Sequence, residues 1–421
     1  MFQRELEAQP AEERTELQRE RLRALLRRLL GLDSRYWRAK LRGIDEDAAV
    51  ADLPFTVKSE LRDEYPFGTL AVPLAETVRI HASSGTRGRP TIVAYTRADV
   101  ELFADVNARS IAAAGGREDD VLHVAYGYGL FTGGLGLHYG GERLGATVVP
   151  ASGGNVQLQL QLLAELGAAG LACTPSFALL LAERGAGRDI RLRYGVFGAE
   201  PWPEAMREKL EAAWGGIDAC DIYGLSEIIG PGVAAECREA KGVLHVFDDH
   251  FLPEVVDPET GEATDGTGEL VLTTLTKEAL PVLRYRTGDI TRFVEGACAC
   301  GRTHRRIARF SGRVDDMLVV RGVNVFPSEI EEVIFEHPGV GDQYAIVLDR
   351  RQSMPELEVR TELAGEGDLE AVAAELRSRL EQRLRLRTLV SVAPHGALPR
   401  QEVGKARRVY ERLDDRDPLG P

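Results

Sequence analysis

A loop rich in hydroxyl groups, glycines and cations separates two short apolar runs near residue 85. Residues 83–90 read Ser-Ser-Gly-Thr-Arg-Gly-Arg-Pro. Glycines allow tight bends that turn backbone N–H groups and hydroxyls towards an anion, and arginine adds charge-assisted hydrogen bonds to phosphate oxygens. The segment lacks the Lys-Ser/Thr pair of a P-loop. Its composition indicates a phosphate site of another kind, with an ordinary polar loop as the alternative.

Two acidic residues follow glycines in motifs that suit nucleotide chemistry. In "DIYGLSEIIGPG", residues 221–232, Ser226 stands beside Glu227, and a carboxylate next to a hydroxyl suits Mg²⁺. In "YRTGDI", residues 285–290, Asp289 follows a glycine at a strand end and can accept hydrogen bonds from both hydroxyls of a ribose. Taken singly, Ser226 is also explained as a helix cap and Asp289 as a turn residue.

Soft metal ligands occur in two short segments. "CACG" carries a close pair of cysteines, and "ECREAKGVLH" carries one cysteine and one histidine. In a reducing compartment such a pair indicates a metal or redox site before a disulfide, with exposed free thiols as the alternative. The predicted Zn²⁺ ligands are Cys237, His245, Cys298 and Cys300, with His304 as an alternative fourth ligand. Cys173 and Cys220 stand among apolar residues and are predicted to be small core residues.

The composition is that of an acidic globular chain. Of 421 residues, 44% are hydrophobic and 28% are charged, and the net charge is −14. Sequence-independent nucleic-acid binding needs lysine and arginine to neutralise phosphates, so it is not expected here. No run approaches the roughly 20 apolar residues of a membrane span. The start, "MFQRELEAQPAEERTEL", resembles neither a signal nor a transit peptide. We therefore expect a cytoplasmic protein without membrane or nucleic-acid partners.

Alternating strands and helices must position these motifs. From 78 to 290, short apolar runs alternate with helix-like segments, which predicts crossover units and an α/β domain of mostly parallel sheets flanked by helices. An amphipathic helix is predicted over 11–31, lying on the surface of this domain. Past Gly312 the pattern changes to three strands and two helices, typical of a small, mobile α+β domain. The predicted division is 1–314 for the large domain and 315–421 for the small one.

Taken together and in this order, the motifs resemble the adenylate-forming superfamily of acyl-CoA synthetases, and within it the phenylacetate–CoA ligase family. The resemblance runs from about residue 53 to Tyr410. Its markers are "YGYGLFTGGLGLHYG" (126–140), "FGAEPW" (197–202), "YGLSEIIGPGVAAEC" (223–237), "LTTLTKEALPVLRYRTGD" (272–289) and "RGVNVFPSEIEEVI" (321–334). It implies a two-step reaction. The substrate carboxylate attacks the α-phosphorus of ATP and pyrophosphate leaves, and a thiol, usually that of coenzyme A, then displaces AMP.

The resemblance also implies the catalytic residues. Lys405, in the loop "LPRQEVGKARRVY", would bridge the substrate carboxylate and the α-phosphate in the first step only. It would leave the site when the small domain rotates about Asp315. Glu227 would hold Mg²⁺, and Ser226 would contact phosphate.

The implied nucleotide contacts extend over both halves of the large domain. They are Ser83, Ser84, Gly85, Thr86, Arg87, Gly88, Arg89, Gly198, Ala199, Glu200, Asp221, Tyr223, Gly224, Asp289 and Arg313. Asp289 would hold the ribose hydroxyls, Tyr223 would stack on adenine, and residues 198–200 would line the edge of the base. Arg87 and Arg89 stand where the family usually has threonine and lysine. Arginine can hold phosphate, but its planar fork is not equivalent to an ammonium.

The implied acid pocket is mostly apolar, which favours a flat aryl acid such as phenylacetate or a substituted benzoate. Its lining residues are Tyr126, Phe131, Ile222 and Pro231. His123 and His138 are either polar contacts to a ring substituent or core residues.

The expected function is therefore an aryl-acid–CoA ligase that uses ATP, Mg²⁺ and coenzyme A. One alternative is an adenylating ligase whose acceptor is an amine, a nitrite-like nucleophile or a carrier-protein thiol. Another is a non-catalytic aryl-acid or nucleotide sensor, which the joint presence of Lys405, Glu227 and Asp289 disfavours. Relatives of this kind are commonly dimers, so a homodimer is one assembly to test.

Overall fold

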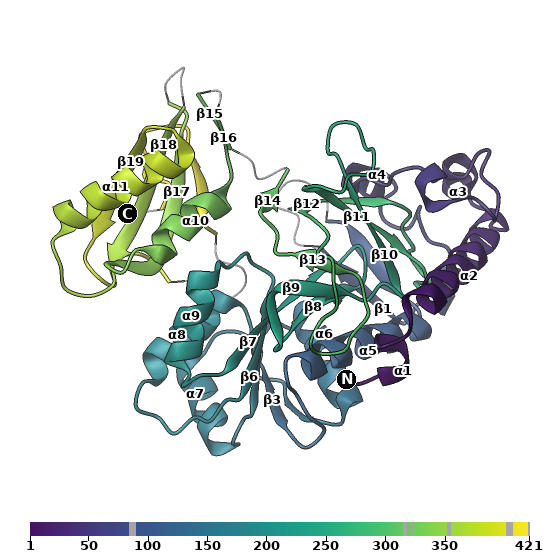
Figure 1. The fold of residues 1–421 in the computed structure, drawn as a ribbon, viewed down its shortest axis with the longest axis horizontal. Helices are drawn as coiled ribbons and strands as arrows, with labels where there is room; N and C mark the ends of the chain where they lie inside the picture. Colours follow the sequence, from purple (N-terminus) through teal and green to yellow (C-terminus); the bar gives the residue numbers. More distant parts are fainter. Residues whose placement is uncertain (84–89, 315–317, 322, 352–354, 401–406, 420–421) are drawn as a thin grey trace.

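The computed structural model has a large N-terminal part and a small C-terminal part (Figure 1). It describes residues 1–83, 90–314, 318–321, 323–351, 355–400 and 407–419. Several predicted site residues lie outside the described residues, namely Ser84, Gly85, Thr86, Arg87, Gly88, Arg89, Asp315 and Lys405.

A central eight-stranded sheet, in the order β13-β9-β8-β7-β6-β5-β3-β4, forms the body of the large part. The strands are β3 (Val121–Val124), β4 (Thr147–Val149), β5 (Gly170–Cys173), β6 (Tyr194–Gly198), β7 (Asp218–Leu225), β8 (Gly230–Cys237), β9 (Ala240–Val246) and β13 (Arg306–Ala308). Strands β4, β3, β5, β6 and β7 run parallel, which confirms the predicted parallel sheet. Strands β8, β9 and β13 extend it antiparallel, and the sequence did not indicate this extension.

Helices cover both faces of this sheet because successive strand residues point to opposite sides. Leu171 and Phe197 share one core cluster with α7 (Val156–Glu165), α8 (Pro175–Gly185) and α9 (Glu204–Ala213). Ala172 and Val196, their neighbours in sequence, share another cluster with α5 (Arg97–Ala113) and α6 (Gly133–Leu144). Cys173 and Cys220 are buried in these clusters, as predicted.

A second, antiparallel sheet and a hairpin complete the large part. The sheet consists of β10 (Phe251–Val256), β11 (Gly268–Thr274), β12 (Tyr285–Thr291) and β14 (Gly312–Arg313). The hairpin pairs β1 (Arg79–Ala82) with β2 (Ile92–Tyr95). Short helices α1 (Arg4–Glu7), α3 (Arg35–Lys40) and α4 (Lys58–Asp63) lie in the first 63 residues.

The small part is an α+β unit with more strands than predicted. Its sheet has the order β19-β18-β17-β20, with β17 (Val340–Asp349), β18 (Glu356–Leu363), β19 (Thr388–Ala393) and β20 (Val409–Arg412). Helices α10 (Pro327–Glu336) and α11 (Leu369–Leu384) agree with the two expected helices, and β15 (Leu318–Val320) pairs with β16 (Val323–Val325). The expectation of three strands was wrong. The edge strands β19 and β20 are short and partly exposed, so they lack a clear apolar run.

Helix α2 (Ala11–Leu30) lies against the large part through the predicted leucine face. Leu22, Leu25, Leu26 and Leu29 are buried, whereas Leu30, also predicted on this face, is 40% exposed. The helix is 20 residues long and rich in charge, and the described part of the chain contains no helix apolar and long enough to cross a membrane.

A buried ion-pair network anchors α2 at the motif "FDDHF", residues 247–251. Asp249 forms two hydrogen bonds with Arg109, at 2.8 and 3.0 Å, and neither side chain is exposed. Asp248 Oδ1 lies 3.1 Å from Arg14 Nη1 of α2 and 2.8 Å from His304 Nδ1. Asp248, Asp249 and His304 are close enough to share a metal ion, but arginines already neutralise both carboxylates. We therefore interpret this cluster as a structural network.

Candidate active site

The predicted phosphate loop lies between β1 and β2 in the sequence, and most of it is outside the described residues. Ser83 ends the described part of the first arm of the β1–β2 hairpin. The Ser83 backbone N–H donates to the carbonyl of Thr91 at 2.9 Å, and the Ser83 hydroxyl accepts from the Thr91 backbone N–H at 3.2 Å. These two bonds join Ser83 to Thr91 directly beyond the paired residues Ala82 and Ile92 of the hairpin.

Ser226 and Glu227 lie in the turn that joins β7 to β8. The Glu227 side chain is 3% exposed, and its Oε1 atom lies 3.1 Å from Nζ of Lys58. Lys277, which no sequence motif predicted as a site residue, is buried and donates to the Glu227 carbonyl at 2.9 Å. Burial lowers the pKa of Lys277 to about 8. Lys277 thus fixes the backbone of the turn while the Glu227 carboxylate faces a second ammonium.

Glycines allow the backbones of β6 and β8 to lie very close to the backbone of β7. A Cβ atom on Gly224 would lie 1.8 Å from the carbonyl oxygen of Gly230, and one on Gly198 would lie 2.2 Å from that of Ile222. Ala199, directly after β6, has a φ of +71°, a left-handed conformation that costs an alanine energy. This strained turn coincides with the segment predicted to line adenine.

The Glu200 side chain has a structural role that the sequence did not predict. Its Oε1 atom accepts from the backbone N–H of Ser176 at 2.7 Å, in the first turn of α8. A carboxylate is stabilised at a helix N-terminus because the unpaired N–H groups carry partial positive charge. Glu200 thereby ties the strained turn after β6 to α8.

Three predicted nucleotide residues meet at one point. Asp289 on β12 lies opposite Arg313 on β14, and the Arg313 guanidinium donates to Asp289 Oδ1 at 2.7 Å. The Tyr223 hydroxyl, reached from β7, donates to Asp289 Oδ2 at 2.6 Å. The Tyr223 ring packs on Phe310, with ring centroids 4.3 Å apart. Burial and the Asp289 carboxylate raise the pKa of Tyr223, so it remains a donor.

Asp221 lies on β7, two residues before Tyr223. Its backbone N–H donates to Glu236 at 2.8 Å. Burial, together with the Glu236 charge, raises the pKa of Asp221 to about 6. The carboxyl is therefore close to changing its charge near neutral pH.

The predicted acid-pocket residues gather beside this nucleotide group. Tyr126 and Ile222 are buried in one apolar cluster, and Phe131 packs against it with its ring centroid 6.5 Å from that of Tyr126. The Tyr126 hydroxyl donates to the Gly198 carbonyl at 3.3 Å. Pro231 on β8 is paired with Gly224 on β7. Consecutive residues of β7, Ile222 and Tyr223, thus belong to this apolar cluster and to the hydrogen-bonded group of Asp289, respectively.

The two histidines near the pocket differ in their surroundings. His123 is fully buried, and its Nε2 atom lies 2.5 Å from Oε1 of Gln159, which makes it a core residue. His138 on α6 is partly exposed, with Nδ1 3.3 Å from the Tyr128 hydroxyl and Nε2 3.1 Å from Glu142.

The predicted zinc ligands form one cluster. Cys237 Sγ lies 3.6 Å from Cys298 Sγ, and Cys300 Sγ lies 3.5 Å from His245 Nε2. The four ligand atoms are within 4.8 Å of one another. Hydrogen bonds from Cys237 and His245 lower the pKa of Cys300, which favours its thiolate. The alternative ligand His304 was wrong, because its Nδ1 atom is bonded to Asp248 and it lies in the ion-pair network.

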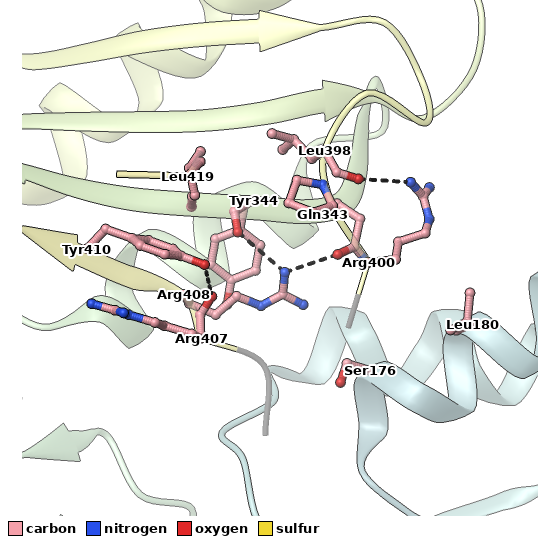
Figure 2. Close-up of a pocket in the computed structure, with 12 residues that line it drawn as sticks. Ser176, Leu180, Gln343, Tyr344, Leu398, Arg400, Arg407, Arg408, Tyr410 and Leu419 are labelled. Carbon is pink, nitrogen blue, oxygen red and sulfur yellow. Dashed lines mark hydrogen bonds between the residues drawn. The ribbon is translucent and has the colours of Figure 1, made fainter. Parts of the chain in front are cut away.

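A cavity of about 220 Å³ opens between α8 and the small part (Figure 2). Ser176 and Leu180 line it from α8, and the opposite wall consists of Gln343, Tyr344, Ala345, Leu398, Pro399, Arg400, Arg407, Arg408, Tyr410 and Leu419. Residues 398–400 and 407–410, which flank the segment of Lys405, both reach this cavity. The chain therefore enters and leaves that segment at the boundary between the two parts.

Glu331 of α10 is buried near this boundary, where Tyr344 and Arg408 lie close to its carboxyl and Glu200 approaches from the large part. Burial raises the pKa of Glu331 from 4.5 to about 7. Because the folded protein binds this proton more tightly than the unfolded chain, the carboxyl disfavours folding progressively as the pH rises from about 4.5 to 7, and by a constant amount above that.

We therefore expect Glu331→Gln to raise the free energy of unfolding by about 2 kcal/mol at pH 8 and to change it little at pH 5. Urea unfolding at the two pH values measures this difference. Glu332→Gln, on the exposed side of the same helix, serves as the control and should show no such pH dependence. An equal effect of Glu331→Gln at both pH values would contradict the assignment.

Known proteins resemble this chain over nearly its whole length. Residues 44–275 match the family model described as AMP-binding enzyme, and residues 322–413 match that of the AMP-binding enzyme C-terminal domain. The phenylacetate-coenzyme A ligase of Thermus thermophilus is 47% identical, over 98% of this chain and 99% of that protein. The enzyme of the same name from Escherichia coli is 49% identical, over 87% of each chain.

Comparison with solved structures also concerns how the large and small parts are arranged relative to each other. A 2-hydroxyisobutyryl-CoA ligase with bound 2-HIB-AMP in the postadenylation state is 28% identical and superposes with a TM-score of 0.89, covering 97% of this chain and 91% of that one. The same ligase in the thioesterification state, with bound CoA, superposes with a TM-score of 0.71 over the same shares. The two parts of this chain are therefore arranged more like the postadenylation state.

Proposed function

This chain belongs to the AMP-binding enzyme family, in its phenylacetate–CoA ligase branch, and from that premise we propose that it joins phenylacetate, or a close aryl analogue, to coenzyme A. A carboxylate oxygen attacks the α-phosphorus of ATP, and pyrophosphate leaves. The thiol sulfur of coenzyme A then attacks the acyl carbonyl, and AMP leaves. The observation that supports the proposal lies on β7, where Tyr223 donates a hydrogen bond to Asp289 and the adjacent Ile222 belongs to the buried apolar cluster of Tyr126.

The nucleotide group would exchange internal hydrogen bonds for bonds to ATP. Asp289 accepts from Tyr223 and Arg313 in this structure, and ribose hydroxyls can replace those donors. The Tyr223 ring, backed by Phe310, would offer its other face to adenine. The turn after β6 would contact the edge of the base through its backbone. Arg313 would remain near the ribose or the phosphates as a positive charge.

Glu227 would hold Mg²⁺, which in proteins takes one or two carboxylates together with substrate phosphates. When bound, the ion neutralises phosphate charge as pyrophosphate leaves. The Glu227 carboxylate is buried and already neutralised by Lys58, whose side chain is 40% exposed. Metal binding would require the Lys58 ammonium to withdraw towards solvent. Lys277 would keep the Glu227 backbone in place during that exchange.

Pyrophosphate release from ATP and Mg²⁺ with a panel of acids tests the activity. The panel is phenylacetate, 4-hydroxyphenylacetate, benzoate, 2-aminobenzoate and cyclohexanecarboxylate. An apolar pocket lined by aromatic side chains should favour phenylacetate and should discriminate against the polar ring substituents. If the enzyme preferred a substituted benzoate, that acid would be the substrate in place of phenylacetate, and the proposed reaction would stay the same.

AMP release with and without coenzyme A separates the remaining alternatives. The proposal expects phenylacetate-dependent AMP release to be faster with coenzyme A. Release that responds to an amine but not to coenzyme A would favour a different acceptor. ATP binding by calorimetry without pyrophosphate release for any acid would favour the sensor.

We further propose that Cys237, His245, Cys298 and Cys300 hold one structural Zn²⁺. Tetrahedral zinc with Zn–S bonds near 2.3 Å brings its ligand atoms to separations of roughly 3.5 to 4 Å. The spacings of 3.6 and 3.5 Å fit this geometry. Such an ion would join β8 and β9 to the loop before β13, and cysteines free to bind metal suit a reducing cytoplasm.

The purified protein should contain about one zinc per chain. Cys298→Ser should lose most of that zinc and several kcal/mol of stability, because zinc ligation contributes directly to folding. Metal analysis and thermal unfolding measure the two effects. Cys220→Ser alters a core cysteine outside the cluster and should keep its zinc. A zinc-free wild-type protein that a metal chelator does not destabilise would contradict the site.

A further inference from the structure

Glu183 of α8 lies opposite Arg400 and His395 of the small part. Its Oε2 atom is 3.6 Å from Nε of Arg400, and its Oε1 atom is 3.7 Å from Nε2 of His395. These three side chains are 12 to 46% exposed, so water only partly screens the charges. This contact connects the large part with the segment that precedes residues 401–406.

A fully buried carboxylate holds the same segment from within the small part. Glu362 on β18 accepts from the backbone N–H groups of Gly396 and Leu398, each at 3.1 Å, and from the Arg400 guanidinium at 2.7 Å. Its side chain has no exposed area. Three hydrogen bonds therefore hold residues 396–400 to β18, so that an interaction with Arg400 acts on the small part.

Arg400 thus bridges a carboxylate of each part, on the rim of the cavity shown in Figure 2. The contact with Glu183 depends on how the two parts are arranged, whereas the contact with Glu362 does not. The arrangement seen here superposes better on the postadenylation state of a related ligase than on its thioesterification state.

We propose that Glu183 is a positioning residue for adenylate formation, because it docks Arg400 and His395 and so favours the domain arrangement in which the first half-reaction occurs. The proposal rests on the ligase activity proposed above. It gives Glu183 no contact with substrate and no role in the transfer of the acyl group to coenzyme A.

Separate measurement of the two half-reactions tests this role. For Glu183→Gln, we expect pyrophosphate–ATP exchange with phenylacetate to fall about two- to fivefold, as for the loss of a partly exposed ion pair. Thioester formation from supplied phenylacetyl-adenylate and coenzyme A should be unchanged or faster. Asp189→Asn removes an exposed carboxylate that pairs with Arg191 inside the large part and should leave both rates unchanged. Equal loss of both half-reactions, or no change in either, would overturn the proposal.

A distance measurement keeps the test independent of catalysis. Fluorophores introduced through unnatural amino acids at Gln161 and Arg377, exposed positions in the two parts, report the domain arrangement. Glu183→Gln should shift the distance distribution away from that of the wild type, and Asp189→Asn should not. If no acid supports pyrophosphate–ATP exchange, the proposed function is wrong. The distance measurement still tests whether Glu183 docks the small part onto the large part. Identical distributions for all three proteins would overturn this docking role.

Discussion

Replacing Lys405 with alanine should lower the rate of pyrophosphate release with phenylacetate by about 10² to 10³-fold, the usual effect of removing one group that stabilises transition-state charge. An ammonium at this position would draw the substrate carboxylate and the α-phosphate together and offset the charge that develops between them. Residues on both sides of its segment line the cavity at the domain boundary, which places the ends of that segment at the boundary between the parts.

The same substitution should spare the second half-reaction. With supplied phenylacetyl-adenylate and coenzyme A, Lys405→Ala should form thioester at close to the wild-type rate, since the lysine acts only before AMP is displaced. Lys405→Arg, which keeps the charge, should retain part of the first half-reaction, although a guanidinium cannot fully replace a compact ammonium. If both half-reactions fell by the same factor, Lys405 would be a structural residue.

Asp249→Asn should lower the free energy of unfolding of the large part by about 3 to 5 kcal/mol, the usual cost of removing one partner from a buried ion pair. Arg109 would keep its positive charge in a site with no solvent exposure, and it would lose one of its two acceptors and the opposite charge that strengthens both hydrogen bonds. Urea unfolding followed by circular dichroism measures this loss.

An exposed ion pair supplies the matched control for this prediction. Glu16→Gln removes a carboxylate that pairs with Arg19 on the outer face of α2, where both side chains are more than half exposed. It should change stability by less than about 0.5 kcal/mol. A similarly small effect of Asp249→Asn would show that water reaches Arg109 and that the network is not a structural anchor.

The sequence was most informative where one short motif carries both a side chain and the backbone that positions it. "YGLSEIIGPG" supplied Tyr223 and the turn of Glu227, and "YRTGD" supplied Asp289 with its strand. Their meeting in space follows from the order of motifs in a known family. Composition alone would have left each of them as an ordinary turn.

The sequence was least informative for contacts between distant residues. Glu183 and Arg400 are separated by more than 200 positions, and no local pattern marks either as a partner of the other. Lys277 reads as a charged turn residue, although it is buried beneath Glu227. Such contacts depend on how the helices and strands pack against one another, and a local sequence pattern does not specify that packing.

The ion-pair network of α2 has a consequence for synthesis on the ribosome. Arg14 can bind Asp248 and His304 only after these residues have been synthesised, 234 and 290 positions later. The ion pair between Glu7 and Arg302 spans 295 positions. At a usual elongation rate, roughly 15 to 60 s pass between the emergence of the first helix and that of its partners. During that interval the leucine face of α2 lacks Leu275 and Leu283, the members of its core cluster that come late in the sequence. The core around α2 therefore cannot be completed until more than half of the chain has been synthesised.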